Sequence, residues 1–175
     1  MNQEQFRYLA AVIAAHPEKK IVGRTRLQKT IKLLQRLGLP TDYSFMNYFY
    51  GPYSEGIQFD IGLLEEFGLI REHEVTSDGG NPLYIIEVED IIQQNELDKK
   101  IQEAIDILAK ERNTDILEIA ATYDAFREMG SDHDDALERL RRKKAKKCTP
   151  QNLKKADSLL KQLNLLDEKR SLYAA

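Results

Sequence analysis

Hydrophobic residues recur at helical spacing in two segments near the start of the chain. The first segment, residues 2–16, ends at Pro17, and the second, residues 25–37, stops before Gly38 and Pro40. Their apolar positions are Phe6, Leu9, Ala10, Ile13 and Ala14 in the first and Leu27, Ile31, Leu34 and Leu37 in the second. Each set falls on one side of an α-helix, so the pattern predicts two amphipathic helices.

The second helix has its own start signal and a basic side. Thr25 and Gln28 form a capping-box pattern, in which the Thr hydroxyl accepts from a backbone N–H and the Gln side chain reaches back. Lys29, Lys32 and Arg36 fall opposite the apolar positions of this helix. We therefore expect a helix that is capped at Thr25 and presents a basic outer face.

An aromatic corner follows. Residues 43–50 are rich in Tyr and Phe and predict a short strand. Gly51 and Pro52 are expected to break its pairing, because proline lacks the ladder donor and glycine tolerates unusual φ, and Ser54 is expected to cap a helix over 55–67. Alternate strand side chains point to opposite faces, so two interpretations hold together: rings packed inside, and rings exposed to a partner.

A β-hairpin and a polar segment complete the first part of the chain. Two extended runs, 69–76 and 83–88, are joined by a turn-forming loop at 77–82. The order helix, helix, strand, helix, hairpin is that of a winged helix-turn-helix domain. We assign this domain to residues 1–88 and a polar, acidic linker to residues 89–96.

The rest of the chain is predicted to be helical. Helices are expected over 97–111, 114–129, 131–144 and 150–163, with N-caps at Thr114, Ser131 and Thr149. They predict a C-terminal helical region, 97–175, packed on the first domain. The expected fold class is therefore α+β and predominantly helical, a winged helix-turn-helix-like N-terminal part with a C-terminal helical bundle.

Composition places the protein among ordinary globular domains. Of its 175 residues, 31% are charged and 42% hydrophobic. No apolar run approaches the roughly 20 residues that span a bilayer, and the start carries no signal peptide pattern, so we expect a cytoplasmic protein without a membrane segment. A single cysteine, Cys148, excludes an internal disulfide framework and a cysteine zinc cluster.

Although the net charge is −3, the chain has two basic segments that contain no acidic residue. They are residues 19–36 and residues 139–155, and either is a candidate anion-binding face or simply a solvated helix side. The candidate nucleic-acid contacts are Lys29, Lys32, Arg36, Arg141, Arg142, Lys143 and Lys144. Such contacts would bind the phosphate backbone of a nucleic acid without recognising its bases, and this binding would weaken as the salt concentration rises.

The charge of the third predicted helix argues against conventional DNA recognition. A winged helix places this helix in the major groove, where phosphates demand positive charge. Here the helix carries Glu55, Asp60, Glu65 and Glu66 and no basic residue. The charge pattern therefore favours a protein partner, or a second copy of the chain, over canonical docking on DNA.

Two long stretches resemble a known family. "RLQKTIKLLQRLG" followed by "YSFMNYFYGPYSEGIQFDIGLLEEFGLI" is similar to the YwgA-type proteins, relatives of the SocA and Panacea antitoxin-type domains. "ILEIAATYDAFREMG" and "TPQNLKKADSLLKQLNLL" resemble their helical tail. The matching motif positions are Leu27, Gln28, Lys29, Tyr50, Gly51, Pro52, Ser54, Leu64, Gly68, Leu69 and Ile70.

The resemblance implies a winged-helix-like module that neutralises a partner protein or acts as an adaptor, with DNA binding often suggested. Our first hypothesis is accordingly a non-catalytic regulatory or antitoxin-like protein that binds a partner protein and forms a possible homodimer. Its candidate partner-binding residues are Tyr50, Gly51, Pro52, Tyr53 and Glu55. The alternative is a DNA-binding transcriptional regulator that uses the basic helix faces.

Enzymatic chemistry finds no support in the motifs. No nucleotide-binding loop occurs, and the three histidines are scattered. The acidic cluster at 131–135 is better explained as a helix start whose carboxylates complement the helix dipole than as a metal site. We therefore expect no catalytic residues, no metal and no cofactor, and keep a hydrolase of unknown type as a minor third hypothesis.

Overall fold

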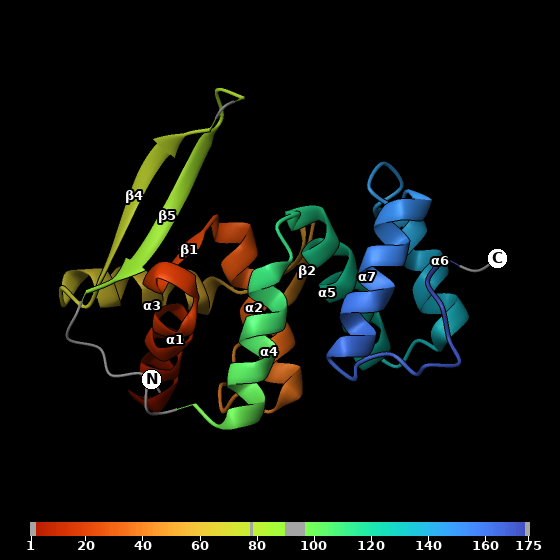
Figure 1. Ribbon diagram of the computed structural model, residues 1–175, viewed down its shortest axis with the longest axis horizontal. Coiled ribbons are helices and arrows are strands. Elements are labelled where there is room, and N and C mark those ends of the chain that lie inside the picture. Colours follow the sequence, from red (N-terminus) through yellow and green to blue (C-terminus); the bar gives the residue numbers. More distant parts are fainter. Residues whose placement is uncertain (1–2, 78, 90–96, 174–175) are drawn as a thin grey trace.

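The computed structural model describes residues 3–77, 79–89 and 97–173. Within these residues the chain forms seven α-helices and two antiparallel β units, a sheet of three strands and a hairpin of two. The fold is therefore mixed α/β and mainly helical, as the sequence predicts. Figure 1 shows the long β-hairpin and the first helix toward one end of the long axis, the short β-hairpin near the middle and the last two helices at the other end.

The first two predicted helices are present. Helix α1 spans Gln3–Ala15 and α2 spans Arg24–Leu37. The predicted capping box at Thr25 is wrong, because α2 begins at Arg24 with Gly23 as the N-cap and no side-chain cap bond. Gly38 ends the helix with a φ of 108°, a left-handed conformation that glycine adopts without a steric penalty.

The aromatic corner forms a short hairpin instead of a single strand over 43–50. Strand β2 spans Met46–Tyr48 and β3 spans Gly51–Tyr53, so the Gly-Pro pair lies inside the second strand. Pro52 pairs in register with Asn47. The expected break at this proline is wrong, because proline is tolerated in an edge strand where its missing N–H would point away from the partner.

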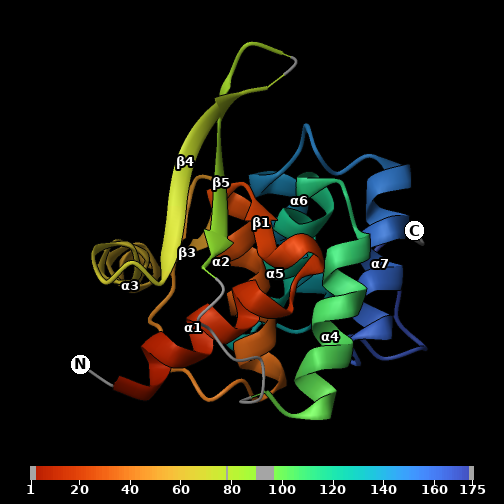
Figure 2. The same cartoon turned by 60° about the vertical axis from the view of Figure 1, so that its left-hand side comes forward.

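The predicted long hairpin is confirmed and joins a strand that the sequence did not reveal. After α3, which spans Glu55–Glu66, come β4 over Ile70–Thr76 and β5 over Pro82–Val88. Strand β1, Lys20–Val22, pairs with β5 and gives the sheet order β1-β5-β4. Ser54 is the N-cap of α3 but makes no side-chain cap bond. In Figures 1 and 2 the arm of β4 and β5 projects from the body of the protein.

Four helices follow, as predicted, with caps shifted by one residue in two of them. The predicted caps Thr114 and Ser131 are wrong, because Asn113 and Asp132 occupy those positions, while Thr149 is confirmed. Each of the observed caps accepts a hydrogen bond from a backbone N–H of its helix. The helices are α4 (Lys99–Lys110), α5 (Thr114–Glu128), α6 (His133–Lys143) and α7 (Pro150–Gln162).

Helix α5 lies at the centre of the packing. Residues 116–126 are all buried, and α5 contacts α2, β3, α6 and α7. An unbroken run of buried residues puts buried side chains on every side of the helix, so other elements must pack around α5 on all sides. The division into residues 1–88 and 97–175 stays a prediction, and the predicted linker at 89–96 lies outside the described residues apart from Glu89.

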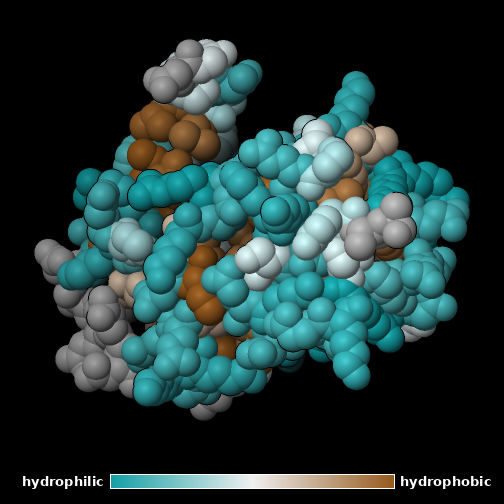
Figure 3. Space-filling view, turned by 45° about the vertical axis from the view of Figure 1, so that its right-hand side comes forward, coloured by the Kyte–Doolittle hydropathy of each residue, from teal (hydrophilic) through white to brown (hydrophobic). Residues whose placement is uncertain are grey.

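The visible surface is mostly hydrophilic. Figure 3 shows one face on which apolar patches interrupt the polar surface, one of them on the arm of β4 and β5. Among the described residues, the helices are too short or too polar to traverse a lipid bilayer.

Candidate functional site

The β2–β3 hairpin exposes a group of large apolar side chains. Phe49 at its tip is 82% exposed, Met46 and Tyr50 are 59% exposed, and Tyr48 is 43% exposed. The rings meet edge to face, with centroids 5.1 Å apart for Phe49 and Tyr50 and 5.6 Å apart for Tyr48 and Tyr53. Residues 46–50 therefore form an exposed aromatic surface, which we call the aromatic hairpin surface.

Three lysine side chains hold the hairpin backbone in place. Each donates a hydrogen bond from its ammonium group to a hairpin carbonyl, and the three lysines come from opposite ends of the sequence. The pairs are Lys29 with the carbonyl of Pro52 at 2.7 Å, Lys143 with that of Asn47 at 3.0 Å and Lys144 with that of Phe49 at 2.7 Å. Bonds to charged donors are stronger than neutral ones, so the exposed surface sits on an anchored backbone.

Gln28 fixes the other end of the hairpin. Its side-chain oxygen accepts from the N–H of Ser54 at 2.8 Å, and its side-chain nitrogen donates to the carbonyl of Ser54 at 2.9 Å. Both contacts are buried. This explains why Gln28 takes no part in a capping box: its amide acts as a backbone partner that joins α2 to the start of α3.

Burial shifts the titration of Lys29. Its side chain is 1% exposed, and desolvation lowers its pKa from 10.5 to about 8, with Lys144, Lys147 and Lys143 adding to the effect and Glu118 opposing it. The folded pKa lies below the unfolded one. Between pH 8 and 10.5 the unfolded state therefore binds more protons, and the free energy of unfolding rises with pH in that window.

We expect the wild-type protein to gain about 2 kcal/mol of stability between pH 7.5 and 9.5 relative to Lys29→Met, which has no proton to lose. Urea unfolding of both proteins at several pH values measures this difference. Because all other titrating groups are shared, the comparison isolates Lys29. Parallel pH profiles for the two proteins would contradict a depressed pKa at this position.

A buried carboxylate supports two of the neighbouring lysines. Glu118 on α5 is 3% exposed and accepts from Lys144 at 3.0 Å and from Lys147 at 2.8 Å. Asp115 also pairs with Lys147 at 2.8 Å. The ring of Tyr50 lies about 6 Å from both ammonium groups, at 6.0 Å and 5.8 Å, within cation–π range. The carboxylate thus positions Lys144, which binds the Phe49 carbonyl, and Lys147, which lies near the Tyr50 ring.

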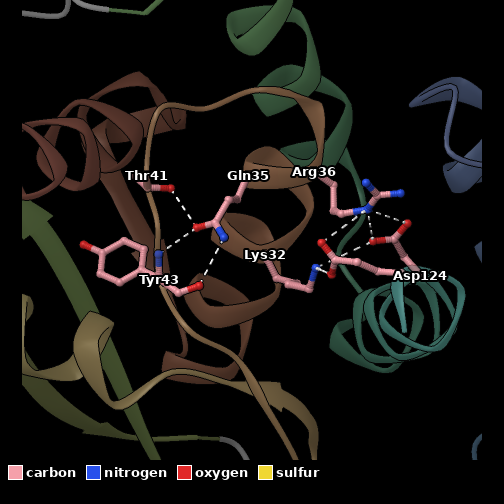
Figure 4. A network of polar contacts seen from close by, with 7 residues as sticks. Lys32, Gln35, Arg36, Thr41, Tyr43 and Asp124 are labelled. Carbon is pink, nitrogen blue, oxygen red and sulfur yellow. Dashed lines mark hydrogen bonds and ion pairs between the residues drawn. The ribbon is translucent and has the colours of Figure 1, made fainter. Parts of the chain in front are cut away.

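The predicted basic outer face of α2 is wrong. Lys29 and Lys32 are buried, and Figure 4 shows Lys32 and Arg36 pointing from α2 toward Asp124 on α5. Lys32 contacts Glu128 at 2.5 Å, and Arg36 contacts Asp124 at 3.0 Å. Burial raises the pKa of Asp124 although Arg36 and Lys32 oppose the shift. The cause of the error is α5, which covers this side of α2 and supplies the carboxylates.

A neighbouring polar network orders the chain that leads into the hairpin. Figure 4 shows Gln35 of α2 between Thr41 and Tyr43. Its side-chain oxygen accepts from the Thr41 hydroxyl at 2.9 Å and from the Tyr43 N–H at 3.0 Å, and its nitrogen donates to the Tyr43 carbonyl at 3.1 Å. The segment before β2 is therefore held by α2 as firmly as the segment after β3.

The second predicted basic segment divides into exposed and buried cations. Arg141 and Arg142 are exposed, whereas Lys143 is half-buried and Lys144 is 5% exposed. The two lysines are the ones that contact the hairpin. The expectation of a uniformly solvent-facing basic run is therefore wrong for Lys144, and nucleic-acid binding through this segment stays a prediction.

An open cleft of about 770 Å³ lies between α2, the hairpin and the start of α3. Its wall includes Tyr48, Tyr50 and Tyr53, and Lys29 and Gln28 belong to its lining. The other lining residues are Arg24, Thr25, Gly51, Glu55 and Gln58. The cleft therefore combines aromatic rings with a few polar groups, a composition typical of recognition sites.

The structure brings the five predicted partner-binding residues together but exposes only some of them. Tyr50 and Glu55 are exposed and Tyr53 is half-buried. Gly51 and Pro52 are buried, so they shape the site rather than offer a surface. All but Pro52 line the large cleft.

Sequence reasoning missed the most exposed members of the site. The sequence pattern places Met46, Tyr48 and Phe49 in a strand, and their exposure depends on a turn at 49–50. The signal that could have found it is Gly51, whose φ of 88° suits a residue just after a tight turn. The anchoring lysines carried no such signal, because a lysine that binds a carbonyl and one that faces water have the same local pattern.

Comparisons with known proteins add no assignment. No family model matches the chain, and no curated protein matches it. The resemblance to the YwgA-type proteins therefore stays a prediction from the motif residues.

Proposed function

We propose that this protein is a non-catalytic regulatory or adaptor module that binds a partner protein through the aromatic hairpin surface. The observation that carries the proposal is the contrast within the hairpin. Phe49 is 82% exposed, while the carbonyl of the same residue is held by Lys144 at 2.7 Å. An apolar surface on a fixed backbone is arranged for contact with another molecule.

Two physical arguments support this function. Aromatic residues and methionine are enriched at protein interfaces, and a cluster of them in one exposed place is unusual for a surface without a partner. A surface that is already ordered also loses little conformational entropy on binding. The lysine contacts supply this order here, since they fix three carbonyls within residues 47–52.

We further propose that the N-terminal part is a winged helix variant followed by a C-terminal helical bundle. The order α1, β1, α2, α3, β4, β5, with β1 paired to β5, supports the assignment. The β2–β3 hairpin is inserted where a helix-turn-helix has a short turn. This insertion carries the aromatic hairpin surface. The segment that distinguishes this fold from a common winged helix is therefore the segment to which we assign partner binding.

The charge of α3 favours a protein over DNA as the partner. Glu55, Glu65 and Glu66 are exposed on this helix, and it carries no basic residue. Carboxylates in that position repel phosphates. Of the candidate nucleic-acid contacts, Arg141 and Arg142 are the exposed ones, and we keep DNA binding through them as an alternative outcome of the test below.

We expect the double variant Phe49→Ser, Tyr50→Ser to lose at least about 2 kcal/mol of binding energy, or roughly thirtyfold in affinity, for its partner. The measurement is capture from native cell extract by tagged protein, followed by titration with the captured partner. Phe59→Ser is the matched control, because Phe59 is 57% exposed on α3 and lies outside the hairpin.

Capture that is lost in the hairpin variant and kept in Phe59→Ser supports the proposal. Equal capture by all three proteins would contradict it. Sedimentation of the pure protein tests whether the partner is a second copy. Salt-sensitive binding of mixed-sequence duplex DNA that depends on Arg141 and Arg142 would favour the alternative.

A further inference from the structure

A second, smaller cleft lies on the other side of the ring pair of Tyr48 and Tyr53. Its volume is about 270 Å³, and it shares Tyr48, Tyr53 and Glu55 with the large cleft. The ring pair is therefore a ridge with a cleft on each side. The remaining lining residues are Gln5, Asp42, Tyr43, Ser44, Met46, Ser54 and Gly56.

The two clefts differ in charge. Glu55 lines both clefts, but the large cleft also contains the cations Arg24 and Lys29, whereas the small cleft adds Asp42 and contains no cation. Both carboxylates are on exposed residues, and in the part of the chain that the structure describes neither of them has an ion-pair partner. The small cleft therefore combines two tyrosine rings with two unneutralised carboxylates.

The other polar groups near the small cleft bond to one another and do not neutralise the carboxylates of Asp42 and Glu55. The carboxylate of Asp60, which is buried beside the cleft, already accepts from the hydroxyl of Tyr43 at 2.7 Å and from Gln5 at 3.3 Å. Gln5 also accepts from the N–H of Asp42 at 3.1 Å, which fixes the backbone that carries the Asp42 side chain. The wall of the cleft is thus ordered by hydrogen bonds that leave the Asp42 and Glu55 carboxylates free.

We propose that the small cleft binds a lysine or arginine side chain of the partner protein, held between the Tyr48–Tyr53 ring pair and the carboxylates of Asp42 and Glu55. This inference rests on the proposed function and names the chemistry of the segment that the hairpin recognises. The ligand is an extended peptide segment that crosses the aromatic ridge.

The chemistry of the cleft suits such a side chain. A cation near a tyrosine ring is attracted by the ring, and the two carboxylates add charge-assisted hydrogen bonds. The aliphatic stem of a lysine or arginine packs on apolar surface while its charged end stays near water, and Met46 and the tyrosine rings supply that surface.

The large cleft sets the direction of the bound segment. The large cleft contains Lys29 and Arg24, and Arg24 is paired with Glu72, so this cleft attracts a basic side chain less than the small cleft does. The neighbouring residue of the segment then falls on the other side of the ridge, where three tyrosines favour an apolar or acidic side chain. Specificity arises from the difference in the attraction of a cation between the two sides of the ridge.

The test is selection from an oriented peptide library by the immobilised full-length protein. The probe is a set of random decapeptides in which one central position is fixed in turn as each amino acid. We expect lysine and arginine at that position to be enriched about threefold over alanine. The variant Asp42→Asn, Glu55→Gln keeps the shape of the cleft and removes its charge, so we expect it to lose the enrichment.

The matched control is Glu66→Gln, Glu103→Gln, which removes two exposed carboxylates outside both clefts and should keep the enrichment. Enrichment that persists in the cleft variant, enrichment of acidic residues, or a library that does not bind would each overturn the inference. Peptide binding that needs Phe49 and Tyr50 but shows no basic preference would overturn the cation site and leave the proposed function intact.

Discussion

Gly51→Ala should destabilise the protein by about 2–5 kcal/mol, one of the two largest effects that we expect from a single substitution. The φ of Gly51 is 88°, a conformation that costs an L-residue energy. A Cβ atom here would also overlap the hydroxyl oxygen of Thr122 on α5. The added atom therefore meets backbone strain and a buried helix together, and urea unfolding measures the loss.

Two variants separate these causes. Gly68→Ala imposes a similar φ, 67°, with nothing within 4 Å of the new atom, so it measures the strain alone at about 1 kcal/mol. Adding Thr122→Ala to Gly51→Ala removes the overlapping oxygen, which has no hydrogen-bond partner among the residues that the structure describes, and should recover part of the loss. If Gly51→Ala costs no more than Gly68→Ala, the close approach of β3 to α5 is not real.

Glu118→Ala should cost about 3–5 kcal/mol, because it leaves Lys144 as a buried charge without its carboxylate. The side chains of both residues are 4% exposed. Lys144 also binds the Phe49 carbonyl, so we expect the variant to loosen the hairpin and to weaken partner binding beyond the loss of stability. Unfolding in urea gives the first effect, and affinity measured well below the unfolding midpoint gives the second.

A surface pair of the same charge type provides the control. Lys99 and Glu103 are separated by four residues on α4, with side chains 91% and 64% exposed, so Glu103→Ala should cost less than about 0.5 kcal/mol. Glu118→Gln keeps an acceptor for Lys144 and should fall between the two alanine variants. A Glu118→Ala protein as stable as Glu103→Ala would show that the buried pair contributes no net stability.

The sequence predicted the helices because their signals are local. The spacing of Leu27, Ile31 and Leu34 identifies α2 without any knowledge of its neighbours, and Gly38 marks its end by a conformation that glycine adopts readily. The caps of α5 and α6 were misplaced by one residue, since Asn113 and Asp132 stand next to Thr114 and Ser131 and cap equally well.

What escaped prediction depends on contacts that are distant in the sequence. Strand β1 has three residues and exists because Ile21 meets Ile86 in β5, far along the chain. The local pattern predicts that the side of α2 that carries Lys29 and Lys32 faces solvent, because its partner, α5, begins far along the chain, at Thr114. Charge alone does not reveal whether a lysine faces water or a buried carbonyl.

The lysine contacts of the hairpin also set an order of events during synthesis. Lys143 and Lys144 follow the carbonyls that they bind by 96 and 95 residues. At roughly 5–20 residues per second, a ribosome needs about 5–20 s to reach them after the hairpin has been made. Two of the three lysine anchors therefore become available only when α6 has been made, and a nascent chain that stalls earlier holds its hairpin through Lys29 and Gln28 alone. On the proposed function, a chain whose translation has not passed α6 would present a less ordered aromatic surface to the partner.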